Sequence, residues 1–529
     1  MKLTRFALVT LILACLPSAA LSQQGTVKGI VVNRETGSPV RDVIITLSTG
    51  KMISTTDELG YFSFTADPGN INLYFDLPGF DQATANITVK PREITDAGKI
   101  ELTDQNYFDQ NLPTISISDG GDDDDMGSQA IQGLLNSSAD VFVSAAAYTF
   151  GPLYFRIRGY EQQYSLVTLN GFVLNDVESG IPYFSNWGGL NDVMRNTMIT
   201  SGPDPIGYLF EPVGGISRII TRASEYRAGV KAVYSLSNRT YRNRAMATYS
   251  SGMLDNGWAF TGSFSYRWSE QGYEPGTFYN AKSFFIAAEK RINSRHSLNL
   301  TALDAIYRRG VAGGSTQEAY DLAGSNYYNP YWGYQNGEVR NARVRHSNKP
   351  LMTLKHIWDP ADNINIQTTI GYWGGVGGYT ALNWYDVEDP RPDYYRKLPG
   401  YFTDPDDQQE IAITWKDPAV SQINWDYFYF ANRKNLFTVS DANGISGNEV
   451  TGNRSKYIVE DRRNDLSRFQ FNTRLTWDLT QRLNITGGAV ADIYNGHNFN
   501  VIDDLLGGEY WLDIDQFAER DFPNDPLSP

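Results

Sequence analysis

Side chains that could carry out chemistry are present in this chain, but they are not grouped as catalysis or metal binding requires. The four histidines are scattered, without the spacing of a metal-ligand set. They are His296, His346, His356 and His497. The carboxylate run Asp122–Asp125 lacks the spaced ligands of a calcium loop, and neither a Gly-x-Ser-x-Gly elbow nor a Walker loop occurs. We therefore expect no enzyme, no metal site and no cofactor, although a close carboxylate pair in the fold would favour a secreted hydrolase.

The overall charge limits the partners further. The net charge is −15 at pH 7, and binding to nucleic-acid phosphates needs a basic face. We therefore expect no nucleic-acid partner. Aromatic residues make up 13% of the chain, which fits either the aromatic girdles of a membrane protein or a surface that stacks on sugars.

One group of aromatic residues lies in the predicted loop Tyr307–Lys349. Its members are Tyr327, Tyr328, Tyr331, Trp332 and Tyr334. Their faces could stack on sugars or on an apolar ligand, so the group is a candidate ligand-binding surface. The alternative is that the rings pack the loop on itself, because a large ordered loop must bury some of its side chains.

The elements that would position these residues are strands with strict two-residue periodicity. In Trp258–Trp268 the aromatic residues and Gly262 fall on one face, and Ala259, Ser263 and Arg267 belong to the other. Asn363–Trp373 and Ser467–Trp477 repeat the pattern, and Val230–Leu236 and Leu483–Ala491 are weaker copies. A membrane-crossing β-strand needs about 9–11 residues, apolar toward lipid and polar toward the lumen. These segments therefore predict transmembrane strands.

Less regular strand candidates raise the number found to nine. They are Ala245–Gly252, Lys282–Glu289, Ser297–Leu303 and Leu351–Trp358. Short gaps between the candidates alternate with long connections, as in outer-membrane barrels. The longest connection, Gly374–Asp465, has room for a further hairpin, for example around Ile411–Trp415.

The N-terminus has the pattern of a secretory signal, with Lys2 and Arg5 before an apolar stretch and a small-residue cleavage site that ends at Ser22. We assign residues 1–22 to it. An alternative reading makes Cys15, the only cysteine, the acylated residue of a lipoprotein signal. After residue 22 no apolar run reaches 18 residues, so the sequence predicts no membrane helix.

Residues 23–103 consist of short alternating runs separated by turn residues, which predicts a small β-sandwich. The runs are Val27–Val32, Val43–Leu47, Tyr61–Phe64, Asn72–Phe75 and Thr84–Val89. The segments Gly29–Val32, Gly37–Val40 and Thr56–Phe64 resemble the carboxypeptidase regulatory-like domain. Because Gly25–Leu102 contains no His or Cys, the resemblance implies a sandwich module and not a peptidase.

Residues 104–127 read as a flexible linker, because the segment is polyacidic and contains glycine. Within it, Thr114–Ser118 (Thr114, Ile115, Ser116, Ile117 and Ser118) is extended and β-prone. A strand of this kind can add to the exposed sheet edge of a partner protein.

Residues 128–225 carry three motifs in a fixed order. These are Arg156–Tyr160, Val167–Gly171 and Gly214–Arg222. Together they resemble the plug of TonB-dependent outer-membrane transporters, which implies a mixed α/β plug domain here. Trp187–Asp192 adds to the likeness.

A sandwich placed before the plug resembles the Bacteroidota branch of the same family. The starch-utilisation members of that branch usually carry an Ala-x-Tyr-Gly stretch, and Asp204–Phe210 departs from it. A polysaccharide is therefore not the ligand that this segment indicates, and siderophore, glycan, peptide and cobalamin all stay open.

The resemblance implies that residues 226–529 are the N-terminal part of a transmembrane β-barrel. The family's barrel has about 22 strands, so nine candidates make an incomplete antiparallel barrel. We expect a fragment of a longer protein or a truncated gene product. The predicted fold class is therefore mainly β, with a small sandwich, a mixed plug and part of a barrel.

The resemblance also implies a mechanism and a location in the outer membrane of a Gram-negative bacterium. Thr114–Ser118 would contact TonB, which belongs to an inner-membrane motor complex, and the plug would open to admit an unknown ligand. Arg156 and Arg158 would hold the plug to carboxylates of the wall. Outer-membrane lipid and a possible surface lipoprotein complete the expected partners. The main alternative is a secreted or surface glycan-binding β-protein, an adhesin.

Overall fold

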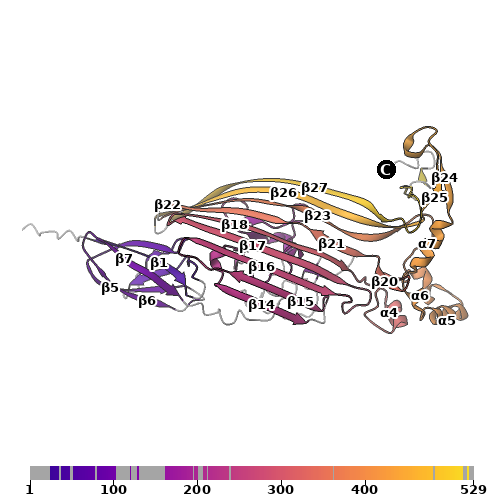
Figure 1. Ribbon diagram of the computed structural model, residues 1–529, viewed down its shortest axis with the longest axis horizontal. Coiled ribbons are helices and arrows are strands. Elements are labelled where there is room, and N and C mark those ends of the chain that lie inside the picture. Colours follow the sequence, from indigo (N-terminus) through magenta and orange to yellow (C-terminus); the bar gives the residue numbers. More distant parts are fainter. Residues whose placement is uncertain are drawn as a thin grey trace, which may run out of the picture. The chain divides into compact units, whose positions relative to one another are not determined.

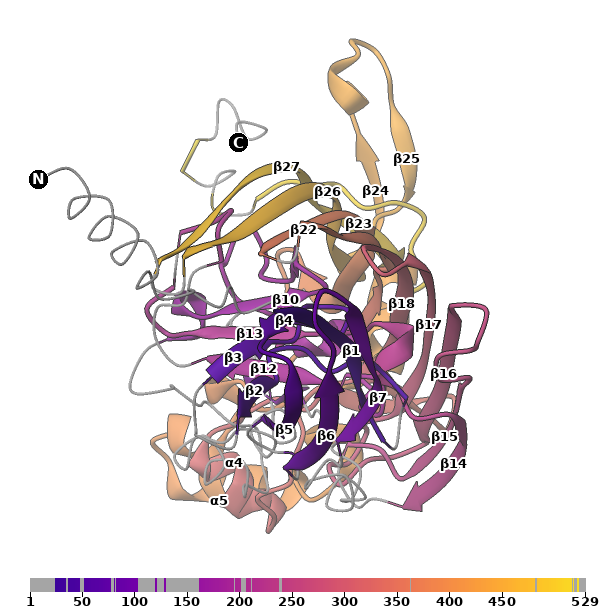
Figure 2. The same cartoon turned by 90° about the vertical axis from the view of Figure 1, so that its left-hand side faces the viewer.

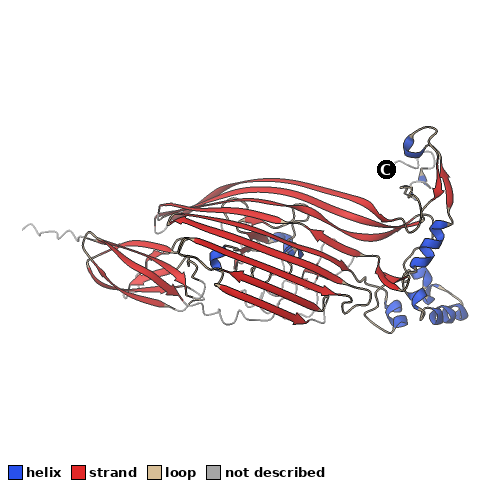
Figure 3. Cartoon of the chain, in the orientation of Figure 1, coloured by secondary structure: helices blue, strands red, loops and turns tan. Residues whose placement is uncertain are grey.

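The computed structural model describes residues 24–102 and 161–522, apart from short gaps, together with two residue pairs between them. The gaps are 35–36, 48–51, 78–79, 81, 195, 201–205, 211, 237–239, 362, 481–482, 516 and 518–520. The chain divides into two compact units, residues 1–111 and 112–529, and each is described by itself. In both, strands dominate (Figure 3).

The first unit is a β-sandwich of two sheets, as the alternating runs predict. One sheet has the order β4-β1-β7 and the other the order β3-β2-β5-β6. The strands are β1 (Gly25–Asn33), β2 (Ile44–Leu47), β3 (Met52–Thr55), β4 (Tyr61–Ala66), β5 (Gly69–Asp76), β6 (Ala83–Val89) and β7 (Ile94–Leu102). Buried Val27, Ile45, Phe62 and Phe75 form part of its core. All five predicted runs fall on strands, whereas β3 and β7 are additional.

The second unit is built on a ten-stranded antiparallel sheet with the order β14-β15-β16-β17-β18-β21-β23-β26-β27, in which β22 pairs with β18 and β23 beside β21. Its strands are β14 (Gly229–Leu236), β15 (Asn243–Ser250), β16 (Trp258–Ser269), β17 (Tyr279–Asn293), β18 (His296–Gly310), β21 (Val344–Asn348), β22 (Leu351–Ala361), β23 (Ile364–Trp384), β26 (Tyr457–Thr480) and β27 (Leu483–Asp504). The strands lie side by side in Figure 1, and the sheet is open, with β14 and β27 at its edges.

Each of the nine strand candidates falls on a strand of this sheet. The tenth strand, β21, lies inside the predicted loop Tyr307–Lys349 and was missed. Several strands are also longer than the roughly 9–11 residues predicted for a membrane-crossing strand, since β23, β26 and β27 contain 21, 24 and 22 residues.

A small mixed sheet packs against the concave side of the large one. It has the order β11-β10-β13-β12 and contains β10 (Leu166–Leu169), β11 (Phe172–Val173), β12 (Thr197–Thr200) and β13 (Ile216–Ile219). Only β10 and β13 are parallel. The end-on view shows the large sheet following an arc, with β10, β12 and β13 inside it (Figure 2). We call the described part of this region, residues 161–225, the plug, and the large sheet the wall.

Plug and wall share one apolar core. The plug contributes Leu169, Phe172 and Trp187 among others, and the wall contributes Phe285 and Trp373. The contact is close at Gly371, where an added Cβ would lie 2.3 Å from a ring carbon of Phe172. Any larger residue at this position would therefore displace β11 from the wall.

The long connections of the wall carry the helices, which gather at one end of the large sheet (Figures 1 and 3). They are α4 (Gln317–Ala323), α5 (Pro405–Thr414), α6 (Pro418–Ser421) and α7 (Trp425–Arg433). Two hairpins accompany them, β19 (Trp332–Gln335) with β20 (Glu338–Asn341), and β24 (Leu436–Val439) with β25 (Val450–Asn453). In the sequence, a further pair of two-residue strands occurs between the two main described ranges. It consists of β8 (Asp119–Gly120) and β9 (Ser128–Gln129).

Local capping explains where these helices begin. The Thr316 hydroxyl accepts a hydrogen bond from the Ala319 amide at the start of α4, and Gly324 ends that helix in a left-handed conformation. Asp404 caps α5 ahead of Pro405, its first residue. The hairpin expected around Ile411–Trp415 is therefore wrong, because this segment is the end of α5 and the residue that follows it.

Candidate functional site

The wall has a reversed distribution of polarity, with apolar side chains exposed and polar side chains buried. On β16, Phe260 and Phe264 are 43% and 51% exposed. Thr261, Ser265 and Arg267, which alternate with the aromatic residues, are at most 2% exposed. Other exposed apolar residues of the wall are Phe284, Ile286, Leu300, Met352, Leu354, Trp358, Ile370, Tyr372, Phe469 and Ile493. A sheet folded in water has the opposite arrangement.

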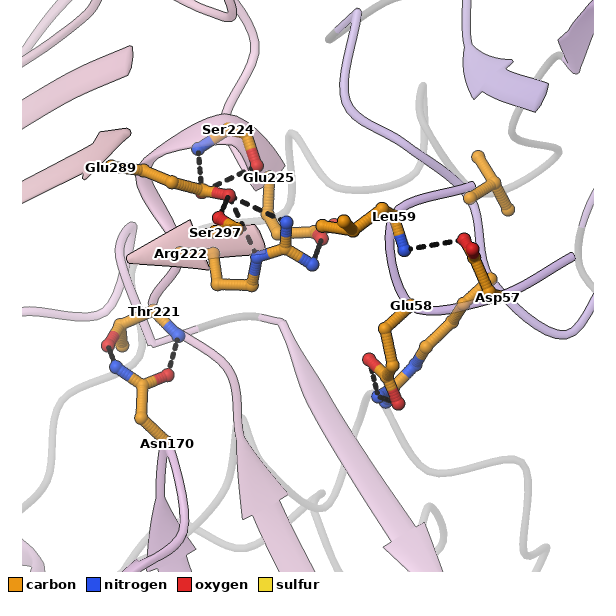
Figure 4. A network of polar contacts seen from close by, with 12 residues as sticks. Asp57, Glu58, Leu59, Asn170, Thr221, Arg222, Ser224, Glu225, Glu289 and Ser297 are labelled. Carbon is orange, nitrogen blue, oxygen red and sulfur yellow. Dashed lines mark hydrogen bonds and ion pairs between the residues drawn. The ribbon is translucent and has the colours of Figure 1, made fainter. Parts of the chain in front are cut away.

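Beside the shared apolar core, the inner face of the wall carries buried polar groups that meet the plug through hydrogen bonds. One buried contact, the one that carries charge, joins Arg222 to Glu289 of β17, which are 3% and 0% exposed. The guanidinium Nη2 lies 2.6 Å and Nε 3.2 Å from the same carboxylate oxygen. Ser224 donates its hydroxyl and amide to the other oxygen, and Ser297 donates its hydroxyl to the first (Figure 4). Every acceptor position of this carboxylate is thus engaged.

A second contact is built from uncharged groups. Within the plug, the side chain of Asn170 makes two hydrogen bonds to Thr221 (Figure 4). Its Nδ2 donates to the Thr221 hydroxyl, and its Oδ1 accepts from the Thr221 backbone amide. Its amide also lies 3.2 Å from the hydroxyl of Thr301 on β18, and its backbone carbonyl accepts from Thr369 of β23 at 2.7 Å. Asn170 has a positive φ of 52°, a conformation that Asn tolerates better than most residues.

The third contact involves β26 and β27. Arg468 makes hydrogen bonds to the Asp492 carboxylate through Nε and Nη2, the shortest at 2.6 Å. Its remaining nitrogen, Nη1, donates to the backbone carbonyls of Val173 and Asn175 in the plug. Gln470 accepts from the Val173 amide at 2.9 Å. Arg468 and Gln470 of the wall therefore hold the plug by its backbone, which places few demands on the plug sequence.

The predicted segment Trp187–Asp192 supplies a fourth contact through Gly188 and Gly189. The Gly188 carbonyl accepts from Ser283, and the Gly189 carbonyl accepts from Arg244 at 2.9 Å. A Cβ on Gly189 would lie 2.9 Å from the Ser283 hydroxyl, and φ is +88°. Only glycine fits this turn without displacing the wall.

Tyr208 lies in the segment that departs from the starch-utilisation pattern. Its hydroxyl donates to the Gly171 carbonyl at 2.8 Å. Burial raises the pKa of Tyr208 to about 12, and nearby Arg218 and Arg474 lower it only in part. The phenol therefore stays a neutral donor at physiological pH.

The predicted aromatic group in the wall's long loop divides into two kinds of residue. Tyr328 and Trp332 are 6% and 9% exposed. The Tyr328 ring packs on Trp415, with 5.0 Å between ring centroids, and its hydroxyl donates to the Ser421 carbonyl. Burial raises the pKa of Tyr328. For these two residues, packing of the loop on itself is what the structure shows.

The other members of the group are more accessible. Tyr327 and Tyr334 are 56% and 48% exposed, and Tyr327 contacts Tyr273 edge-to-face. The Tyr331 ring lies under the guanidinium of Arg343, at 5.4 Å. The structure thus brings Tyr331 to the inner side of the wall, beside a basic region.

Several predicted site residues lie outside the described residues. These are Thr114–Ser118, Arg156 and Arg158. The plug–wall contacts that the structure does describe use Arg222, Glu289, Arg468 and Asp492, which the sequence did not single out. One signal was available, because Glu289 is a charged residue on the face of β17 that also carries Ala281, Ser283, Phe285 and Ala287.

The histidines are distributed over separate places. The rings of His296 and His356 stack, with 3.1 Å between Nδ1 and Nε2, while His346 contacts Asp461. His497 stacks on Phe499. Within the described residues, no group of three or more His, Cys, Asp or Glu side chains is arranged to hold a metal ion.

Comparison with known families identifies the first unit. Residues 26–103 match the carboxypeptidase regulatory-like domain. This match confirms the resemblance seen in Gly29–Val32, Gly37–Val40 and Thr56–Phe64. No curated protein matches the chain by sequence. None of the helices in the described part of the chain combines the length and the apolar character needed to cross a bilayer.

Solved structures to which the chain is similar include two receptors and one transporter. The chain is similar to the siderophore receptor PiuA from Acinetobacter baumannii, with 13% identity and a TM-score of 0.38 over 65% of this chain and 40% of that one. The open form of the ferric-catecholate import receptor Fiu from E. coli K12 has 14% identity and a TM-score of 0.39, covering 68% and 47%. The unliganded ferric citrate transporter FecA has 10% identity and a TM-score of 0.38, covering 66% and 41%.

The chain therefore spans between 40% and 47% of the length of these three solved chains. With TM-scores this low, the likeness carries no part of the argument that follows. That argument comes from the polarity of the wall and from its contacts with the plug.

Proposed function

We propose that this chain forms the plug and part of the wall of a TonB-dependent outer-membrane receptor, which imports a ligand with energy from the inner-membrane proton gradient. The observation that carries the proposal is the reversed polarity of the wall. Its exposed face presents rows of Phe, Ile, Leu and Trp, and its buried face binds a small folded domain through buried polar groups and a shared apolar core. An apolar face of this extent is stable in hydrocarbon, whereas in water it promotes aggregation.

The chain would then have five functional parts. Residues 1–22 direct secretion, 23–103 form the sandwich module, 104–127 form the linker, 128–225 form the plug and 226–529 form the wall. Thr114–Ser118 would pair as a strand with TonB, because main-chain hydrogen bonds resist a pull along the strand and need little sequence specificity.

The plug–wall contacts suit a plug that is held firmly but can be released. Most of them are hydrogen bonds to backbone carbonyls or between small polar side chains, which water can replace when the interface opens. Arg222 and Glu289 are the exception, because separating a buried ion pair leaves charges without partners. Arg156 and Arg158 would add further ionic contacts of this type.

The proposal requires that the open edge strands of the wall, β14 and β27, are paired when the wall lies in lipid. In lipid, each unpaired backbone group along β14 and β27 would cost several kcal/mol. The receptor therefore needs further strands that join these two edges and close the barrel.

Fractionation of cells that produce the protein tests this proposal. We expect the chain in the outer-membrane pellet after a sodium carbonate wash, because an apolar wall face stays in lipid at high pH. A glycan-binding adhesin held only by surface contacts would instead be released into the supernatant, and that result would reject the outer-membrane receptor.

A further inference from the structure

The inner face of the wall carries a row of basic and aromatic residues that the plug contacts do not use. Cross-strand pairing places Tyr279 of β17 opposite Arg309 of β18, and Arg309 opposite Arg345 of β21. Arg345 pairs with Tyr379 of β23, which pairs with Arg462 of β26. Residues directly opposite each other share a face of the sheet. These five residues therefore form one continuous row, which we call the basic row.

Strand alternation shows that the basic row faces inward. Arg309 and Thr301 are an even number of positions apart on β18, so their side chains lie on the same face of the strand, and Thr301 bonds to the plug. Arg462 and Arg468 are likewise an even number of positions apart on β26, so they share a face, and Arg468 also bonds to the plug. The row lies toward the helices of the long connections, beyond the contacts of the plug, and so lines the space between the plug and those connections.

The arginines gather around the Tyr379 ring. The guanidinium carbons of Arg343, Arg345 and Arg462 lie 4.7, 5.9 and 6.0 Å from its centroid. Arg343 also covers Tyr331 from the predicted aromatic group. Three cations converge on one phenol, whereas a single cation–π contact needs only one of them.

Nearby carboxylates compensate this charge unevenly. Glu460 binds Arg462 at 2.7 Å and also accepts from Asn383, and Glu274 lies close enough to Arg309 to feel its charge. Arg345 is half-buried, and its guanidinium has neither an ion pair nor a hydrogen bond within the described part of the chain. It also lies directly opposite Arg309, and like charges in that relation repel each other. An anion between them would remove the repulsion.

We propose that the basic row binds a small polyanion that carries several carboxylate or phosphate groups. The proposal rests on the receptor function above and names the class of its ligand. Guanidinium groups form paired hydrogen bonds to carboxylates and phosphates, and the tyrosine rings offer flat contacts between them. The row from Arg309 to Arg462 crosses three strand spacings, roughly 14 Å, so it suits a molecule with several anionic groups.

Calorimetry on the detergent-solubilised protein at physiological salt tests the proposal. The probes are tricarballylate, which has three carboxylates, tripolyphosphate, and neutral maltotriose of similar length. We expect saturable binding of at least one anion and none of maltotriose, and the comparison of the two anions identifies the preferred group. Arg345→Gln is expected to weaken anion binding about tenfold, as loss of charged hydrogen bonds does, and Arg345→Lys to restore part of it.

Arg308→Gln is the matched control. Arg308 is the neighbour of Arg309 on β18, but it points to the opposite face, where it covers Phe278. The Arg308→Gln variant should therefore bind the anions as the native protein does. Binding of neither anion, binding of maltotriose alone, or equal losses in Arg345→Gln and Arg308→Gln would each overturn the polyanion site. None of these three results would change whether the protein fractionates with the outer membrane. The calorimetry therefore tests the polyanion site separately from the proposed receptor function.

Discussion

Replacing Glu289 by glutamine is expected to release the plug from the wall far more often than in the native protein. The substitution keeps the side-chain shape but leaves the buried Arg222 guanidinium without its main counter-charge, and Glu225 at 3.6 Å replaces it only in part. Breaking a buried pair in this way costs about 3 kcal/mol. Pulse proteolysis across a urea series should therefore show about a hundredfold larger population of open plug.

Two further variants separate the ion pair from general damage to β17. Lys290→Gln changes the next residue, on the opposite face, where Lys290 lies over the Trp258 ring, and should stay within about 0.5 kcal/mol of the native protein. The double variant Arg222→Met with Glu289→Leu should recover much of the loss, because no charge is left buried alone. If Glu289→Gln opens no more than Lys290→Gln, this pair does not hold the plug.

Deleting Pro113–Ser118 is expected to remove binding to TonB while ligand binding at the outer surface is retained. A six-residue strand contributes several main-chain hydrogen bonds, each of about 1 kcal/mol, so affinity should fall by at least about a hundredfold. Surface plasmon resonance between the detergent-solubilised protein and the periplasmic domain of TonB measures this affinity.

A deletion of equal length supplies the control for this experiment. Removing Gly121–Met126 shortens the linker by the same six residues and takes away the four aspartates, but it spares the proposed strand. Affinity for TonB should then stay close to native. Retained affinity after deletion of Pro113–Ser118, or equal loss in both deletions, would place the TonB contact elsewhere in the chain.

The sequence predicted the strands of the wall well because their signal is local. Successive residues of Trp258–Trp268 alternate between an exposed face and the face toward the plug, so alternation alone defines β16 and its two faces. Strand ends were less predictable. β26 continues upstream through Glu460, Arg462 and Asp465, where polar residues follow one another and the alternation that predicts the strand is lost.

Short or irregular elements carried too little signal. β21 contains only Val344–Asn348, and its polar residues read as part of a loop. The end of α5 has the alternation of a strand, because Ile411 and Ile413 alternate with Ala412 and Thr414. The Asp404 cap and Pro405 that start the helix lie several residues upstream. Capping residues are a local signal that would have identified this helix.

The plug–wall contacts could not be predicted, because they depend on long-range register. Asn170 meets Thr301 across 131 positions, and Arg468 meets the Val173 carbonyl across 295. No periodicity connects residues at such separations. Both hydrogen bonds from Arg468 to the plug also go to backbone carbonyls, which leave no trace in the plug sequence.

The central claim is that the exposed apolar face of the wall contacts lipid. A spin label at Ile286→Cys tests it most directly, in a protein with Cys15→Ser reconstituted in lipid vesicles, since Ile286 lies in the middle of β17 and is 60% exposed. Tyr327→Cys, in the long loop and 56% exposed, gives the aqueous reference. We predict that the label at residue 286 collides with oxygen dissolved in the bilayer and is shielded from a water-soluble nickel chelate, while the label at 327 shows the reverse. A label at residue 286 that collides with the nickel chelate as often as the label at 327 would contradict the account.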